Sequence, residues 1–246
     1  MRTETENKLE IIENFWRHFI WEYNFCLRKI NFSKDIPNNY VGIILGYFQD
    51  TLDVVFKERT QETYIERFAY NISLLQAIYV HQDFIEELLI IFKCDKNKGD
   101  LKKDNDYSIN REIRNELIGH PIRKIEIPKN DFKPSLCDKC GNIIDKPKKK
   151  SVLLSSALFA YDSDKSSITY LKYHKDNNYE FESKSYNISD IIQRHRLFLN
   201  RYLDLILKKS KSILKQFEKE IDKLLKLAET SDFETIIKVV SIGLYL

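Results

Sequence analysis

Residues 110–121 read Asn-Arg-Glu-Ile-Arg-Asn-Glu-Leu-Ile-Gly-His-Pro, and the chain changes character on either side of them. Before this stretch, apolar residues recur at helical spacing, and after it come short runs rich in strand-forming residues. Gly119 and Pro121 predict a helix end, because glycine accepts a positive-φ cap and proline cannot continue a helix. Ser108 can cap the first turn. We therefore expect a short helix from Ser108 to about Ile118, followed by strands.

The segments before this stretch predict three helices, at about residues 8–30, 40–57 and 61–94. The third is apolar around most of its circumference, which is typical of a central, buried helix. His81 falls in its apolar sector, where a histidine is more often a hydrogen-bonded core residue than a ligand. A last helix is expected from residue 188 to about 229. Its apolar residues repeat every three or four positions, which favours packing along another helix, in the same subunit or a partner.

Three short strands are predicted between these helical parts, at residues 152–161, 167–173 and 179–183. The fold class is therefore mainly α, a bundle of four to five helices with a small three-stranded antiparallel β insertion. We divide the chain into a helical core at 1–128, a lysine-rich loop with the β insertion at 129–186, and a long C-terminal helix at 187–246 that completes the bundle.

Composition narrows the classes of function. The 246 residues are enough for a sizeable core. Forty basic and 37 acidic residues leave a net charge of +3, so a nucleic acid would have to bind a local patch. The charged start does not resemble a signal peptide, and no apolar run approaches the roughly 20 residues of a membrane helix. Four scattered cysteines do not form a secreted disulfide framework. We expect a cytoplasmic protein that makes no use of a membrane.

Arg114 and His120 are the residue types that handle a phosphate group. Arginine is permanently charged and presents several donors, whereas histidine transfers protons near neutral pH. In an unbroken helix the two side chains would lie about 120° apart, at roughly 100° per residue. Two features can bring them together. The Gly-His-Pro end leaves the helix, because a residue before proline avoids the α region. A two-fold dimer can also bring both copies to one cleft.

Residues 114–120, Arg-Asn-Glu-Leu-Ile-Gly-His, resemble the signature of the higher eukaryote and prokaryote nucleotide-binding (HEPN) superfamily. That signature is an arginine, four to six residues that often begin with a polar one, and a histidine; here there are five, beginning with Asn115. Residues 74–83, Leu-Leu-Gln-Ala-Ile-Tyr-Val-His-Gln-Asp, also resemble the long helix of bacterial HEPN proteins whose motif ends in Gly-His-Pro. The resemblance covers residues 1–121 and the final helix. The strands and the cysteines depart from the minimal family core.

The resemblance implies a HEPN-like helical bundle and a metal-independent endoribonuclease, acting as a homodimer in toxin–antitoxin or anti-phage defence. RNA would be the substrate, no cofactor would serve catalysis, and an antitoxin or other defence protein would be a partner. The products would carry 2′,3′-cyclic phosphate and 5′-hydroxyl ends.

The chemistry assigns a role to each residue of the motif. His120 suits proton transfer and Arg114 suits stabilisation of the phosphorane charge. Asn115 is expected to orient the histidine or hold a phosphate oxygen. Three further residues are candidates for positioning the catalytic residues without touching the substrate: Gln82, Asp83 and Glu116.

Other interpretations stay open. Arg114 can be a surface ion-pair residue, with Glu112, Glu116 or Asp83 as partner, and His120 a helix end favoured by the macrodipole. The whole chain can be a non-catalytic HEPN module that binds RNA or a nucleotide or docks to a partner protein. It can also be a purely structural helical dimer.

Two further features lie between the motif and the strands. Cys137 and Cys140 have the spacing of half a zinc ribbon, so we consider a structural zinc ion, completed by a second copy or by His174, against a loop with two free thiols. Lysines of the same region are candidates for RNA binding, with stacking on tyrosines such as Tyr170, against a merely solvated loop. They are Lys146, Lys148, Lys149 and Lys150.

Overall fold

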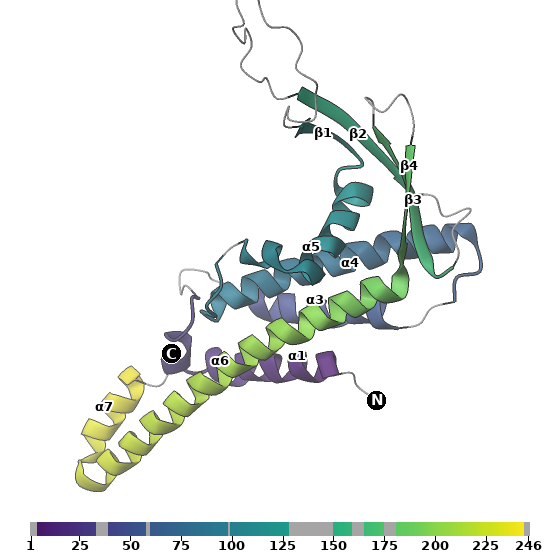
Figure 1. Ribbon diagram of the computed structural model, residues 1–246. Coiled ribbons are helices and arrows are strands. Elements are labelled where there is room, and N and C mark those ends of the chain that lie inside the picture. The colour runs from purple at the N-terminus through teal and green to yellow at the C-terminus, as the bar shows by residue number, and fades with distance from the viewer. Residues whose placement is uncertain are drawn as a thin grey trace, which may run out of the picture. The chain divides into compact units, whose positions relative to one another are not determined.

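The computed structural model describes residues 4–32, 39–57, 60–97, 99–127, 150–158, 165–174 and 181–243. Within these ranges the protein is mainly α-helical, with seven α-helices and one small antiparallel sheet (Figure 1). The chain forms two compact units. The helical unit comprises Met1–Thr60, Ser73–Arg111 and Asp190–Leu246, and the sheet unit comprises Gln61–Ile72 and Glu112–Ser189.

The N-terminal segment is broken where the sequence predicts a single helix. Helix α1 (Glu4–Phe15) continues as a π-helical turn, η1 (Trp16–Ile20), and a four-residue helix, α2 (Asn24–Leu27), follows. Tyr23 lies between them in an extended conformation, with φ −117° and ψ 117°. This break redirects the chain so that the apolar side chains on both sides of it are buried, among them Trp16, Ile20, Cys26 and Leu27.

Two helices agree closely with the predicted ones, α3 (Tyr40–Phe56) and α4 (Tyr64–Ile91). A third, α6 (Ile188–Thr230), confirms the long C-terminal helix. Its apolar stripe is buried in the core of the helical unit. Of the two expected alternatives, the stripe therefore packs within the same subunit. The buried members are Leu199, Leu203, Ile206, Ile213 and Phe217.

Helix α7 (Phe233–Gly243) was not expected, so the prediction of four to five helices is too low. Asp232 begins it, because its carboxylate accepts a hydrogen bond from the backbone N–H of Thr235 at 2.9 Å. An aspartate at this position satisfies one of the unpaired N–H groups of a first helical turn. The Ser-Asp pair before the apolar run at 236–240 is the sequence signal that identifies this start.

The sheet has four strands instead of the predicted three, in the order β1-β2-β3-β4. They are β1 (Ile122–Ile127), β2 (Lys150–Leu158), β3 (Ser167–His174) and β4 (Phe181–Asn187), each antiparallel to its neighbour. The missed strand, β1, begins directly after Pro121. Only its last three residues, Ile125-Glu126-Ile127, alternate between apolar and charged, and this signal is too short to identify a strand.

The core of the helical unit contains a chain of two buried histidines. His81 Nδ1 lies 3.0 Å from Nε2 of His195, and His81 Nε2 lies 2.7 Å from the hydroxyl of Thr51. That hydroxyl donates to the backbone carbonyls one turn earlier, at 2.8 Å from Tyr47 O. His81 Nε2 must therefore donate to Thr51, and His81 Nδ1 accepts from His195. The expectation that His81 is a hydrogen-bonded core histidine is confirmed.

Both histidines are held neutral by their surroundings. Burial lowers the pKa of His195 to about 3. Burial, together with repulsion from His195, holds the pKa of His81 well below its ordinary value of 6.5. Nδ1 of His195 has no hydrogen-bond partner among the described residues. A proton added to this pair would place a charge among stacked aromatic rings, including Phe48, Phe56 and Phe198.

The depressed pKa values predict acid sensitivity of the fold. The unfolded chain binds protons at these histidines below pH 6.5 and the folded chain does not, so stability is complete above that pH and is lost as the pH falls toward 3. We expect the free energy of unfolding to fall by about 1.4 kcal/mol per pH unit for each histidine. His195→Gln should remove about half of the slope measured by urea unfolding between pH 6 and 5.

His18→Gln is the matched control, because His18 is an exposed histidine of η1 in the same unit. It should leave the slope unchanged. An equal slope in the wild type and in His195→Gln would contradict the assignment of the acid sensitivity to the pair.

Candidate functional site

The motif lies on helix α5 (Asn105–Arg114) and on the π-helical turn that continues it, η3 (Asn115–Gly119). The helical run ends at Gly119, as predicted, and His120 has left it with φ −142° and ψ 63°. Gly119 does not adopt the positive φ expected of a glycine cap. The reason for a glycine here is steric, because the Arg114 guanidinium occupies the space that a side chain would need.

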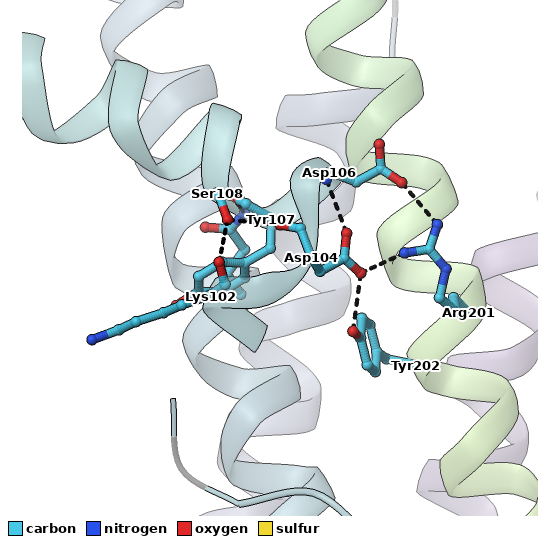
Figure 2. Close-up of polar contacts among 8 residues, drawn as sticks. Lys102, Asp104, Asp106, Tyr107, Ser108, Arg201 and Tyr202 are labelled. Carbon is cyan, nitrogen blue, oxygen red and sulfur yellow. Dashed lines mark hydrogen bonds and ion pairs between the residues drawn. The ribbon is translucent and has the colours of Figure 1, made fainter. Parts of the chain in front are cut away.

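Helix α5 begins three residues earlier than expected, and Asp104 rather than Ser108 is its cap (Figure 2). The carboxylate of Asp104 accepts the backbone N–H of Asp106 at 2.9 Å. Ser108 lies inside the helix, where its hydroxyl donates to the carbonyls of Lys102 and Asp104, at 2.7 and 2.8 Å. A serine bonded back along its own helix is a common alternative to the capping role.

The cap of α5 is bound to helix α6. Arg201 of α6 forms ion pairs with Asp104 and with Asp106, the latter at 2.8 Å, and the Tyr202 hydroxyl donates to Asp104 at 2.9 Å (Figure 2). Only 9% of the Asp104 side chain is exposed. Burial opposes ionisation of Asp104, but the bonds from Arg201 and Tyr202 outweigh it and lower the pKa of Asp104. The start of the motif helix is thus fixed by a buried, charged cap.

The middle of α5 is bound to helix α4 by Gln82 and Asp83. Gln82 donates to the backbone carbonyl of Tyr107 at 3.0 Å. Asp83 accepts from Arg111 at 2.7 Å, and the Arg111 guanidinium lies 4.1 Å from the ring centre of Tyr79. The partner of Asp83 is therefore Arg111. Gln82 and Asp83 hold the helix that leads into the motif.

Asn110 binds α5 to the first turns of α6 and was missed as a site residue. It is fully buried, its amide donates to Ile191 O at 3.0 Å, and its oxygen accepts from Arg194 Nε at 3.2 Å. A buried asparagine inside a helix is a signal of such a bridge, because a buried amide must be hydrogen-bonded. His195, one residue after Arg194, was also missed.

Arg114 lies directly against the residue that precedes His120. A Cβ atom built on Gly119 would meet Arg114 Nη1 at 2.5 Å and Asn115 Oδ1 at 3.3 Å. Arg114 Nη1 also donates to Asn115 Oδ1 at 3.1 Å. The bare glycine therefore leaves the space that the guanidinium occupies. On an ideal helix Arg114 and His120 would lie about 120° apart, whereas here the guanidinium packs on the residue before His120.

The His120 backbone is held while its side chain is exposed. Its N–H donates to Asn115 O at 2.8 Å, which is the i to i+5 bond of a π-turn. Such single π-turns often occur at functional sites. The turn thus keeps Asn115 and His120 at a fixed separation and presents the imidazole at the surface of the sheet unit.

The Glu116 side chain is buried, unlike that of a solvent-exposed helix residue. Its side chain is 1% exposed and accepts the Tyr170 hydroxyl at 2.5 Å and Lys172 Nζ at 2.7 Å, with Lys184 Nζ at 3.9 Å. Burial opposes ionisation, but Lys172 and Tyr170 outweigh it and lower the pKa of Glu116. Tyr170 is fully buried in this cluster, so it is not the stacking surface that the sequence suggested. The three partners of Glu116 were missed.

The predicted zinc and lysine sites lie largely outside the described residues. Cys137, Cys140, Lys146, Lys148 and Lys149 fall in the range 128–149. Lys150 begins β2, and its side chain is not described. Within the described ranges, no group of three or more histidine, cysteine, aspartate or glutamate side chains could hold a metal ion.

An open surface hollow of about 730 Å³ lies beside the α5 cap. Its charged residues are mostly engaged with one another, as in the pairs Arg201–Asp104 and Lys103–Asp100. None of its lining residues belongs to the motif.

Comparison with known proteins finds no match: no family model, no curated protein and no solved structure is similar to this chain. Across the ranges that the structure describes, no helix combines the length and apolar character that a membrane crossing requires.

The buried cap predicts a stability effect that an exposed aspartate would not show. Asp104→Ala removes the cap, takes away the acceptor of the Tyr202 hydroxyl and leaves Arg201 with Asp106 alone, so we expect the free energy of unfolding to fall by about 2 kcal/mol. Asp53→Ala is the control, because Asp53 is an exposed helix residue paired with Lys57, and it should cost less than about 0.5 kcal/mol. Urea unfolding followed by circular dichroism measures both; equal small losses would contradict the role of the cap.

Proposed function

We propose that this chain is a metal-independent endoribonuclease of HEPN type, with Arg114, Asn115 and His120 as its catalytic residues. The observation that carries the proposal is the packing of the Arg114 guanidinium on Gly119, the residue that precedes the exposed His120. The motif's resemblance to the HEPN signature and the mainly helical fold support it.

The chemistry needs only groups that the motif supplies. A base removes the proton of the RNA 2′-hydroxyl, whose oxygen attacks the adjacent phosphorus. The bond from phosphorus to the 5′-oxygen then breaks, and an acid protonates that oxygen. His120 serves in one of these proton transfers. Arg114 stabilises the charge that develops on the phosphorane oxygens, and Asn115, bonded to Arg114, holds the guanidinium toward them. The products are a 2′,3′-cyclic phosphate and a 5′-hydroxyl.

A homodimer completes the site in this proposal. One histidine cannot act as base and acid on opposite sides of the same phosphorus at one moment, and a two-fold axis would supply His120 of a second copy. The biological setting that suits such an enzyme is toxin–antitoxin or anti-phage defence, with an antitoxin or other defence protein as the controlling partner.

The second candidate is a HEPN module that binds RNA, a nucleotide or a partner protein without cleavage. One observation favours it: within the described part of the chain, no side chain hydrogen-bonds to the His120 imidazole. A general base is usually oriented by a second group, although this bond often forms only when substrate is bound.

Cleavage by the wild type and its loss in two variants tests the proposal. We expect purified protein to cleave a pool of transfer and structured RNAs with EDTA present, leaving cyclic phosphate ends. Arg114→Ala and His120→Ala should each lower the rate by at least about 10²-fold, because each removes a group that acts in the transition state.

Arg17→Ala and His18→Ala are matched controls, because both residues are exposed on η1. Both should cleave at the wild-type rate. If all of these proteins bind RNA and none cleaves it, the chain is the binding module and not the enzyme. If His120→Ala still binds and cleaves RNA like the wild type, His120 is not a residue of the site.

Gly119→Ala tests the packing of Arg114. The new Cβ would displace the guanidinium, which is the far end of a flexible side chain, so the fold should lose little stability. The cleavage rate should fall by about 10-fold to 10²-fold, because the cation leaves its position. Gly46→Ala is the control, since a Cβ there meets no atom within 4 Å.

In Gly46→Ala the rate should not change, and the helix should gain about 0.5–1 kcal/mol. Rates from single-turnover assays and unfolding free energies from urea titration measure both effects. An unchanged rate in a folded Gly119→Ala protein would refute the steric role of the glycine.

A further inference from the structure

We propose that Glu116 is a positioning residue that couples the four-stranded sheet to the motif, so that β3 and β4 set the orientation of Arg114 and His120. This inference rests on the proposed function, because the site it positions is the proposed ribonuclease site. It assigns to the sheet, which departs from the minimal HEPN core, a direct part in the activity.

The contacts of Glu116 converge from one face of the sheet. Tyr170 of β3 is directly opposite Lys184 of β4 in the strand register, and Lys172 is two residues further along β3, on the same face. The two carboxylate oxygens divide these partners: Oε1 takes Lys172 at 2.7 Å, and Oε2 takes Tyr170 at 2.5 Å with Lys184 at 3.9 Å. Three groups on two strands therefore fix both oxygens of one side chain.

Because Glu116 belongs to the π-turn, its bonds to the sheet also restrict the positions of the motif residues. Glu116 is the second residue of η3, and the bond from His120 N–H to Asn115 O spans it. The turn continues α5 at its start, but the helical run ends at Gly119, so its last residues can shift where no contact outside the helix holds them. The buried carboxylate opposes such a shift, because moving it would separate it from its partners on β3 and β4.

The cluster must be charged in order to hold the turn. An aliphatic residue at position 116 could fill the same space, but it would remove the buried carboxylate that pairs with the Lys172 and Lys184 ammonium groups, which are 19% and 24% exposed. Glu116→Gln keeps the size of the side chain and an oxygen for Tyr170 while removing the charge. Glu112→Gln is the matched control, because it makes the same chemical change about one helical turn earlier, on an exposed residue of α5 that does not belong to the cluster.

Two readouts on the full-length protein test the coupling separately from the function. The first is hydrogen–deuterium exchange of the backbone amides in η3 and at His120. We expect exchange in Glu116→Gln to be about tenfold faster than in the wild type, with no change in Glu112→Gln. The second is single-turnover cleavage of RNA over a range of RNA concentrations. The maximal rate should fall by about 10²-fold and the half-saturating concentration should stay within about threefold.

Two further variants keep the inference testable if Glu116→Gln does not fold. Tyr170→Phe removes only the hydroxyl that donates to Glu116 and should change both readouts in the same direction by a smaller factor. Lys172→Gln should resemble Glu116→Gln, and the double variant should be no slower than the slower single one, because both changes break one bond.

The outcomes separate the inference from the proposed function. Faster exchange and a lower maximal rate, with RNA affinity kept, would establish the positioning role. Unchanged exchange, or faster exchange with a wild-type rate, would overturn it while leaving the ribonuclease intact. If the wild type cleaves no RNA, the proposed function fails; faster exchange in Glu116→Gln would then support the anchor alone, and unchanged exchange would overturn that as well.

Discussion

The position of the motif helix depends on polar contacts, because α5 has little apolar surface with which to pack. Only two of its apolar side chains, Tyr107 and Ile113, are buried. Its place is fixed instead by a buried cap, a buried amide bridge and an ion pair, through Asp104, Asn110 and Arg111. Hydrogen bonds and ion pairs are directional, whereas apolar packing tolerates sliding and rotation. The part of α5 that belongs to the helical unit is therefore held by directional contacts.

Periodicity predicts the parts of this fold that bury apolar stripes. The segments 40–57 and 188–229 carry such stripes, and they appear as α3 and α6 with nearly the expected bounds. Elements defined by a local capping residue or by a single alternation, such as α7 and β1, were missed, because a few residues carry the signal. The break after η1 depends on which aromatic side chains pack into the core, and the residues that they pack against belong to other helices.

The motif residues and three candidate supports, Gln82, Asp83 and Glu116, could be proposed from the sequence, but the partners of these supports could not. Arg114 and His120 lie six residues apart in one short stretch, and their chemistry follows from residue type. Lys172 and Lys184 are more than 50 residues away, and only the strand register brings both to Glu116. Asp83 was expected near the motif, yet its partner is Arg111, since two arginines three residues apart compete for one carboxylate and sequence does not say which one wins.

The π-turn explains how the motif begins as a helix and ends with the Arg114 guanidinium packed against the residue before His120. An ordinary α-helix would place residues 114 and 120 on different faces, at about 120°. Here the last turn closes through an i to i+5 bond, the residue before the histidine has no side chain, and proline follows it. Each device acts on a different obstacle: the wider turn changes the angle, the glycine makes room for the guanidinium, and the proline stops the helix from continuing. The three features act together on the same short stretch, so its spacing and its residue types have to be considered together.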